Sequence, residues 1–176
     1  MADPFETLGI PPRFELDLGA LEQRHRDLSR ALHPDRFTGT PAAERRLSLS
    51  RAIDVNEAFR TLKDPVRRAE ALVARAGVPV GETGEPKASP ALLMEMMDAR
   101  EELAEAARAR DLGRIGALAA TMSARRAEVE RRLGAALDGG LDDPQRIAAA
   151  LPTLGELRYI RRFLDETTAL EDELAP

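Results

Sequence analysis

A capping residue followed directly by proline recurs along this chain and divides it into helices. The pairs that define helix starts are Thr40-Pro41, Asp64-Pro65, Ser89-Pro90 and Asp143-Pro144. Side chains of serine, threonine and aspartate accept hydrogen bonds from free N–H groups at a helix start. Proline suits the first helical position because no donor is needed there. Alanine, leucine, arginine and glutamate dominate the sequence and favour helices. The sequence therefore predicts an all-α fold.

Hydrophobic periodicity between these starts gives the approximate helix bounds. After one helical turn near residues 5–8, the predicted helices cover about 18–32, 41–62, 65–76, 90–110 and 111–137, with a last one that begins at Pro144. Asp111 is the expected cap of the helix over 111–137. Pro152 lies inside the last segment and should kink or divide it, because its ring clashes with the preceding turn.

The region after residue 76 has the composition of a linker. Residues 77–89 contain three glycines and two prolines. Charge also changes here, since residues 1–76 carry a net charge of +1 and residues 77–176 a net charge of −6. We therefore predict a first domain at 1–76, a linker at 77–88 and a second domain at 89–176.

The tripeptide His33-Pro34-Asp35 lies between two of the predicted helices. The helix before it carries an apolar stripe with helical spacing, formed by Leu21, His25, Leu28 and Leu32. The helix after it carries a second stripe, formed by Leu49, Ala52, Ile53, Asn56 and Phe59. Two antiparallel helices packed through these stripes would display the loop at their tip. Pro34 fixes its own φ and moves His33 out of the helical region, so the loop is stiff and presents an imidazole and a carboxylate.

The helix before the loop also has a basic side. Arg26 and Arg30 lie one turn apart, opposite the apolar stripe. On an isolated helix such arginines are an ordinary solvated face. Beside a displayed loop they form a basic patch that suits a partner protein.

The helix over 90–110 has apolar residues on two sides. Its core stripe is Leu92, Met96, Ala99, Leu103 and Ala106. The opposite side contains Met94, Met97, Asp98, Glu101 and Glu105, with Leu93 at its border. These methionines either dock a partner or fill a second seam of a helical bundle. Tyr159 and Phe163 leave the same two alternatives open on the last helix.

Composition and charge exclude several function classes. The chain has no cysteine, so disulfides, a thiol nucleophile and a Cys-ligated metal are excluded. No apolar run approaches the roughly 18 residues of a membrane span. The first residues lack a basic and apolar signal segment, so we expect a cytoplasmic protein. The acidic second half argues against nucleic-acid binding.

The sequence offers little for catalysis. A helical metallo-enzyme that uses His25, His33 and Asp35 is an alternative, but a third strong ligand is lacking and structural metal sites usually have four. His25 lies on an apolar stripe, where a core role is the simpler interpretation. The carboxylates of Glu101, Glu102 and Glu105 lack the Glu-x-x-His partners of a di-iron bundle and are interpreted as a charged face. We therefore predict no catalytic residue, no metal site and no cofactor.

The first half resembles a J-domain, and the whole chain resembles the HscB family of J-type co-chaperones in iron–sulfur cluster assembly. The matching stretches are Phe-Glu-Thr-Leu-Gly-Ile-Pro at 5–11, His-Pro-Asp-Arg-Phe at 33–37, Val-Asn-Glu-Ala-Phe-Arg-Thr-Leu at 55–62, Arg-Ala-Glu at 68–70, Leu-Met-Glu at 93–95 and Arg-Glu-Glu-Leu at 100–103. His-Pro-Asp alone indicates any J-domain. The stretches at 93–95 and 100–103 are the feature specific to this family.

The resemblance implies an L-shaped, non-enzymatic co-chaperone. Its J-domain would stimulate the ATPase of a specialised DnaK-type chaperone, HscA, and its C-terminal three-helix bundle would hold the scaffold protein IscU. The chaperone-binding residues would be Arg26, Arg30, His33, Pro34, Asp35 and Arg36. The scaffold-binding residues implied by the resemblance are Leu93, Met94, Met97, Asp98, Glu101, Glu105 and Tyr159. The alternative is a general J-domain co-chaperone that delivers unfolded clients.

Overall fold

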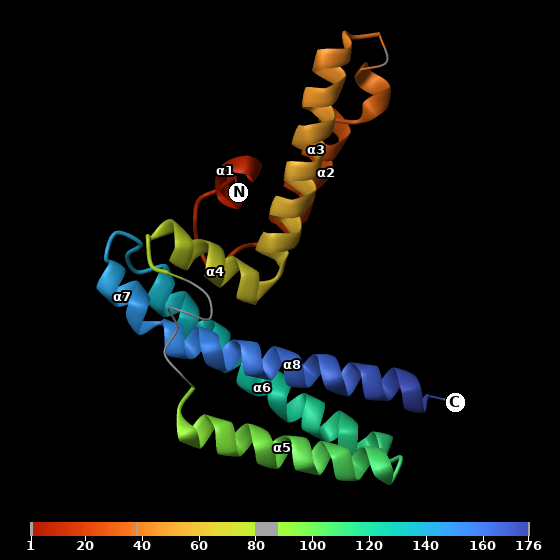
Figure 1. Cartoon of the computed structure of the whole chain (residues 1–176), viewed down its shortest axis with the longest axis vertical. Helices are drawn as coiled ribbons and strands as arrows, with labels where there is room; N and C mark the ends of the chain where they lie inside the picture. Colours follow the sequence, from red (N-terminus) through yellow and green to blue (C-terminus); the bar gives the residue numbers. More distant parts are fainter. Residues whose placement is uncertain (1, 38, 80–87, 176) are drawn as a thin grey trace.

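The computed structural model describes residues 2–37, 39–79 and 88–175, and the regular structure of these residues is helical throughout. The elements are α1 (Pro4–Leu8), α2 (Leu18–Ala31), the 3-10 turn η1 (Pro34–Phe37), α3 (Ala42–Lys63), α4 (Pro65–Arg75), α5 (Pro90–Arg108), α6 (Leu112–Leu137), α7 (Pro144–Ala149) and α8 (Leu151–Leu174). The α2–α3 hairpin extends away from the layer formed by α5, α6 and α8, which gives an L shape (Figure 1). The predicted all-α architecture is confirmed.

Most predicted helix starts are confirmed by side-chain caps. The residues whose side chains accept a hydrogen bond from a first-turn backbone N–H include Asp17, Asp64, Ser89, Asp111 and Asp143. Pro152 lies in the first turn of α8, and α7 ends before it at Ala149, so the predicted division at this proline is also confirmed.

The predicted cap at Thr40 is wrong. Helix α3 begins at Ala42, and Pro41 precedes it without a side-chain hydrogen bond to the first turn. The Thr40 hydroxyl instead donates to the Phe37 carbonyl at 2.9 Å. Thr40 therefore closes the turn that follows the loop and does not start the helix.

Side chains join α2 and α3 into an antiparallel hairpin. The Nε2 atom of His25 lies 2.8 Å from the Asn56 Oδ1 atom, and the imidazole stacks on Phe59 with ring centroids 4.1 Å apart. Nearer the base of the hairpin, the Lys63 ammonium donates to Glu22 at 3.0 Å. His25 is half-buried and hydrogen-bonded, as its place on the apolar stripe predicts.

The predicted core stripe of α3 is wrong at three of its five positions, because Asn56 is exposed as well as Leu49 and Ile53. Leu49 and Ile53 are 57% and 60% exposed. The buried residues of α3 are Ser48, Val55, Ala58 and Leu62. Helix α3 contacts α1, α2 and α4, so its buried side is set by three neighbours and is rotated from the predicted one. The Ser48 hydroxyl can be buried because it donates to the Leu32 carbonyl at 3.3 Å.

Helices α5, α6 and α8 form the C-terminal bundle, and Arg125 of α6 connects all three. Its guanidinium donates to Glu95 of α5 at 2.8 Å and to Glu156 of α8 at 2.9 Å. Burial acts to lower the pKa of Arg125, but the hydrogen bonds to Glu95 and Glu156 outweigh it and raise the pKa. Phe163 of α8 is 1% exposed and fills the interior of the bundle. Of its two alternatives, a seam of the bundle and a docking surface, the seam is therefore confirmed.

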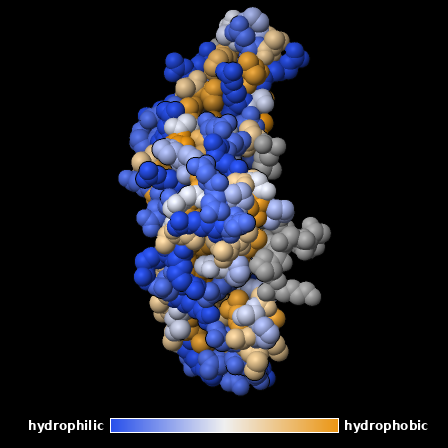
Figure 2. All heavy atoms as spheres, turned by 90° about the vertical axis from the view of Figure 1, so that its left-hand side faces the viewer, coloured by the Kyte–Doolittle hydropathy of each residue, from blue (hydrophilic) through white to orange (hydrophobic). Residues whose placement is uncertain are grey.

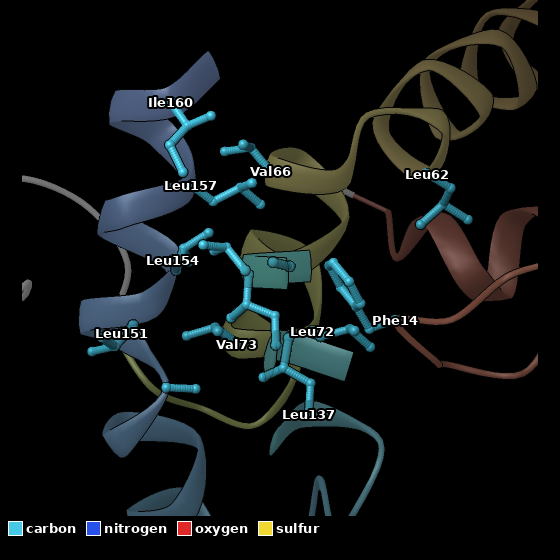
Figure 3. Close-up of a cluster of buried hydrophobic side chains, with 14 of the residues drawn as sticks. Phe14, Leu62, Val66, Leu72, Val73, Leu137, Leu151, Leu154, Leu157 and Ile160 are labelled. Carbon is cyan, nitrogen blue, oxygen red and sulfur yellow. The ribbon is translucent and has the colours of Figure 1, made fainter. Parts of the chain in front are cut away.

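Helix α4 packs against α6 and α8 and connects the hairpin to the bundle. Val66, Leu72 and Val73 of α4 lie beside Leu154 and Leu157 of α8 (Figure 3). Each of these side chains is at most 1% exposed. The hydrophobic core is therefore continuous between the two parts of the molecule.

Two ion pairs border this junction. Arg158 of α8 donates to Glu70 of α4 at 2.7 Å, and Arg161 of α8 lies 3.3 Å from the Asp64 carboxylate. The predicted domain boundary is still a prediction, and residues 80–87 of the predicted linker lie outside the described residues.

We expect Leu72→Ala to lower the free energy of unfolding by about 2–5 kcal/mol, because it leaves a cavity in the core that both parts share. Urea unfolding followed by far-ultraviolet circular dichroism measures this change. The matched control is Leu47→Ala, at a residue 52% exposed, which should change stability by less than about 0.5 kcal/mol. A shift in only part of the transition would contradict a shared core and indicate two independently folding domains.

Candidate functional site

The His33-Pro34-Asp35 loop lies at the tip of the hairpin and is exposed. Pro34 and Asp35 belong to the turn η1, and the Arg36 N–H donates to the His33 carbonyl at 3.0 Å. The His33 Nδ1 atom lies 3.5 Å from the Asp35 carboxylate, and the two side chains are 58% and 85% exposed. A polar, locally ordered loop is thus available to another protein.

The basic side of α2 leads to this loop. Arg26 and Arg30 are exposed, as is Arg36 in η1. Arg26 donates to Gln23 at 2.8 Å and lies 3.9 Å from the Glu22 carboxylate. No ion pair links Arg30 to another residue of the described ranges, so its charge faces solvent.

The outer face of α5 combines apolar and acidic side chains. Met94 and Met97 are 65% and 70% exposed, whereas Met96 on the core side is 5% exposed. A second buried seam is therefore excluded on this side of α5. Asp98 and Glu101 are exposed on the same helix.

Three other predicted scaffold residues have different surroundings. Leu93 is 39% exposed and lies at the border of the face. Glu105 accepts a hydrogen bond from Arg114 of α6 at 3.2 Å, so its charge is partly compensated. Tyr159 belongs to α8, is half-buried and packs against the core. The structure thus gathers most of the predicted residues on α5 but places Tyr159 on a neighbouring helix.

Neither a metal site nor a membrane span is found in the described parts of the chain. No three histidine or carboxylate side chains in residues 2–37, 39–79 and 88–175 are placed to hold a metal ion. Within the same residues, every helix is too short or too polar to cross a bilayer.

The sequence analysis missed the exposed apolar side chains of α3. Leu47, Leu49 and Ile53 are each more than half exposed. A stripe through Ser48, Ala52, Val55, Phe59 and Leu62 has equally good helical spacing and would have left Leu49 and Ile53 outside. That stripe begins with a serine, so hydrophobicity alone does not select it.

Comparisons with known proteins find relatives along nearly the whole chain. The sequence model of the HSCB C-terminal oligomerisation domain matches residues 88–168. The co-chaperone protein HscB homolog of Burkholderia multivorans is 36% identical over 171 residues, which cover 97% of this chain and 94% of that protein. The corresponding protein of Shewanella oneidensis is 34% identical, with 97% of each chain covered.

Solved structures give the same result. Chaperone HscB from Vibrio cholerae superposes with a TM-score of 0.83 at 30% identity, and the match covers 98% of this chain and 99% of that one. Human co-chaperone protein HscB has a TM-score of 0.83 at 23% identity over 96% of this chain and 82% of that one, which supports the fold. The hairpin with its displayed loop is thus the J-domain of a two-part, all-α co-chaperone. The chain belongs to the HscB family of co-chaperones.

We expect truncation of the three methionines of α5 to change the stability of the protein by very different amounts. Met94→Ala and Met97→Ala should each change the free energy of unfolding by less than about 0.5 kcal/mol, because both side chains already contact water. Met96→Ala, the matched buried control, should cost about 2–5 kcal/mol. Urea melts of the three variants measure these values. A large loss of stability in either outer variant would contradict a free surface.

Proposed function

We propose that this protein stimulates ATP hydrolysis by the DnaK-type chaperone HscA and presents the scaffold protein IscU to it during iron–sulfur cluster assembly. The observation that carries the proposal is that one molecule displays two separate surfaces. The first is the His33-Pro34-Asp35 loop at the hairpin tip, and the second is the methionine-bearing face of α5. Membership of the HscB family supports this pairing of surfaces with two partners.

The loop provides recognition without chemistry of its own. The Asp35 carboxylate is 85% exposed and can pair with an arginine of the chaperone's ATPase domain. Pro34 limits the backbone, and the Asp35 N–H lies 3.4 Å from the His33 Nδ1 atom, so both neighbours orient the carboxylate. The chaperone hydrolyses ATP, and this cytoplasmic partner acts as a non-enzymatic activator that needs no cofactor.

The basic side of α2 supports the same contact. Arg26, Arg30 and Arg36 are exposed around the approach to the loop. Clustered positive charge raises the association rate with an acidic partner surface and orients the two proteins as they approach. These arginines therefore guide association, while Asp35 makes the contact on which stimulation depends.

The α5 face suits the scaffold protein. Met94, Met97 and Leu93 provide adaptable apolar contacts, and Asp98 and Glu101 border them. An apolar centre with a charged rim is typical of a specific protein interface. Such a face favours one defined partner over a range of unfolded clients, and the half-buried Tyr159 ring and the paired Glu105 complete the proposed set.

We expect Asp35→Asn or His33→Gln to reduce stimulation of the HscA ATPase by at least about tenfold, because losing one partner of a charged contact costs roughly 2–5 kcal/mol. Steady-state ATP hydrolysis with and without each variant is the measurement. Asp142→Asn, which removes an exposed carboxylate far from the loop, is the control. Full stimulation by Asp35→Asn would contradict the proposed role of the loop.

We expect Met94→Ala/Met97→Ala to weaken IscU binding at least about 30-fold, since each anchor residue contributes on the order of 2 kcal/mol. Titration calorimetry against IscU measures the affinity. Leu112→Ala serves as the control, because Leu112 is another exposed apolar residue of the bundle, at 40%. Wild-type affinity in the double variant would show that the scaffold binds elsewhere.

A further inference from the structure

Arg68 of α4 is the one charged side chain that is buried among the residues that the structure describes, at 7% exposure. The other charged side chains of these residues are at least partly exposed. On the side of the molecule that carries α1, the surface is mostly hydrophilic and apolar residues form small patches (Figure 2). A buried cation has lost its hydration, so the position of Arg68 requires a physical explanation.

The contacts of Arg68 satisfy its guanidinium only in part. One terminal nitrogen donates to the Leu62 carbonyl at 2.8 Å, and the guanidinium lies 4.8 Å from the centre of the Phe14 ring. The Nε atom is buried and has no hydrogen-bond partner among the described residues. Burial lowers the pKa of Arg68, and nearby carboxylates, Glu130 first among them, oppose this shift without forming an ion pair with it. Arg68 is therefore held mainly by one carbonyl and one ring.

These contacts continue from α4 to the end of α6. Phe14 lies between α1 and α2, and its N–H donates to the Asp138 carboxylate at 2.5 Å. The Glu15 N–H donates to the other oxygen of the same carboxylate at 3.0 Å. Asp138 directly follows α6, which ends at Leu137. Arg68, Phe14 and Asp138 thus form a chain of directional contacts that links α4 to the bundle, and we call it the Arg68 contact chain.

The buried side of α4 is otherwise aliphatic. The other buried residues of this helix are Val66, Ala69, Leu72 and Val73. They pack towards leucines of α8 (Figure 3). Hydrophobic contact is non-directional, and cores that keep their volume and pattern lose a unique arrangement before they lose stability. The aliphatic contacts therefore hold α4 on the bundle but do not by themselves select one register of the two helices.

We propose that Arg68 is a positioning residue, which selects one orientation of the hairpin relative to the bundle. A slip of α4 along the bundle by one helical turn, about 5.4 Å, would break either the Arg68–Phe14 contact or the Phe14–Asp138 hydrogen bond. Buried groups of this kind can specify an arrangement while they add little to stability. The inference concerns the angle between the two proposed surfaces and does not depend on what binds them.

The orientation can be measured in the full chain, because the chain contains no cysteine. Ser50→Cys on α3 and Ala120→Cys on α6 are exposed sites for spin labels, and pulsed electron paramagnetic resonance gives the distance distribution between them. Arg68→Met in this background should add distances that differ from the original by about 5 Å, the rise of one helical turn. The urea midpoint should stay close to that of the wild type, because the unfavourable burial of the cation is removed together with its contacts.

Two controls separate orientation from stability. Leu72→Ala, in the aliphatic part of the same junction, should lower the urea midpoint and leave the distance distribution narrow, since the Arg68 contact chain stays intact. Arg161→Met is the matched arginine control. It removes a partly exposed ion pair at the border of the junction and should change neither measurement.

A second variant breaks the same contact chain from its other side. Phe14→Leu removes the ring and keeps the guanidinium, so it should broaden the distance distribution as Arg68→Met does. This variant decides the test if Arg68→Met gives no cooperative urea transition.

A wild-type distance distribution in Arg68→Met, or in Phe14→Leu where it decides the test, would overturn the inference. Equal broadening by Leu72→Ala would also overturn it, because any loosening of the junction would then suffice. No partner protein takes part in these measurements, so each of these outcomes leaves the proposed function standing.

Discussion

The packing of α4 against α6 and α8 is the contact on which the arrangement of the molecule depends. Arg68 of α4 is 7% exposed, its guanidinium lies 4.8 Å from the centre of the Phe14 ring, and it donates to the Leu62 carbonyl at 2.8 Å. The Asp138 carboxylate, at the end of α6, accepts hydrogen bonds from the N–H groups of Phe14 and Glu15 at 2.5 Å and 3.0 Å. Burial lowers the pKa of Arg68, and nearby carboxylates, including Asp138, oppose this shift.

This junction fixes how the two exposed surfaces are presented. The His33 loop is at the far end of the hairpin, and the α5 face is on the far side of the bundle (Figure 1). Neither surface contributes to the junction, so either one is accessible to another protein without any change in the buried contacts of the core. A fixed junction holds the two surfaces at a constant distance from each other, whereas a flexible tether would have to lose conformational entropy to do the same.

Local signals in the sequence predicted the elements well, because caps and prolines act on the residues next to them. Asp64, Ser89 and Asp143 start helices where predicted, and Pro152 divides the last segment. The junction could not be predicted in this way. Asp138 and Phe14 are 124 residues apart, and neither a charge pattern nor a periodicity marks them as partners.

The contrast between α5 and α3 shows why the exposed apolar side chains were predicted on one helix and missed on the other. Helix α5 packs against α6 and α8 on one side, so a single stripe separates its core from its surface and exposes Met94 and Met97. Helix α3 contacts three helices, α1, α2 and α4, so a single stripe does not separate its core from its surface. Ser48 is buried where its hydroxyl donates to the Leu32 carbonyl at the end of α2, whereas the larger Leu49 and Ile53 lie outside. Hydrophobicity shows which side chains can be buried, but the neighbours decide which ones are.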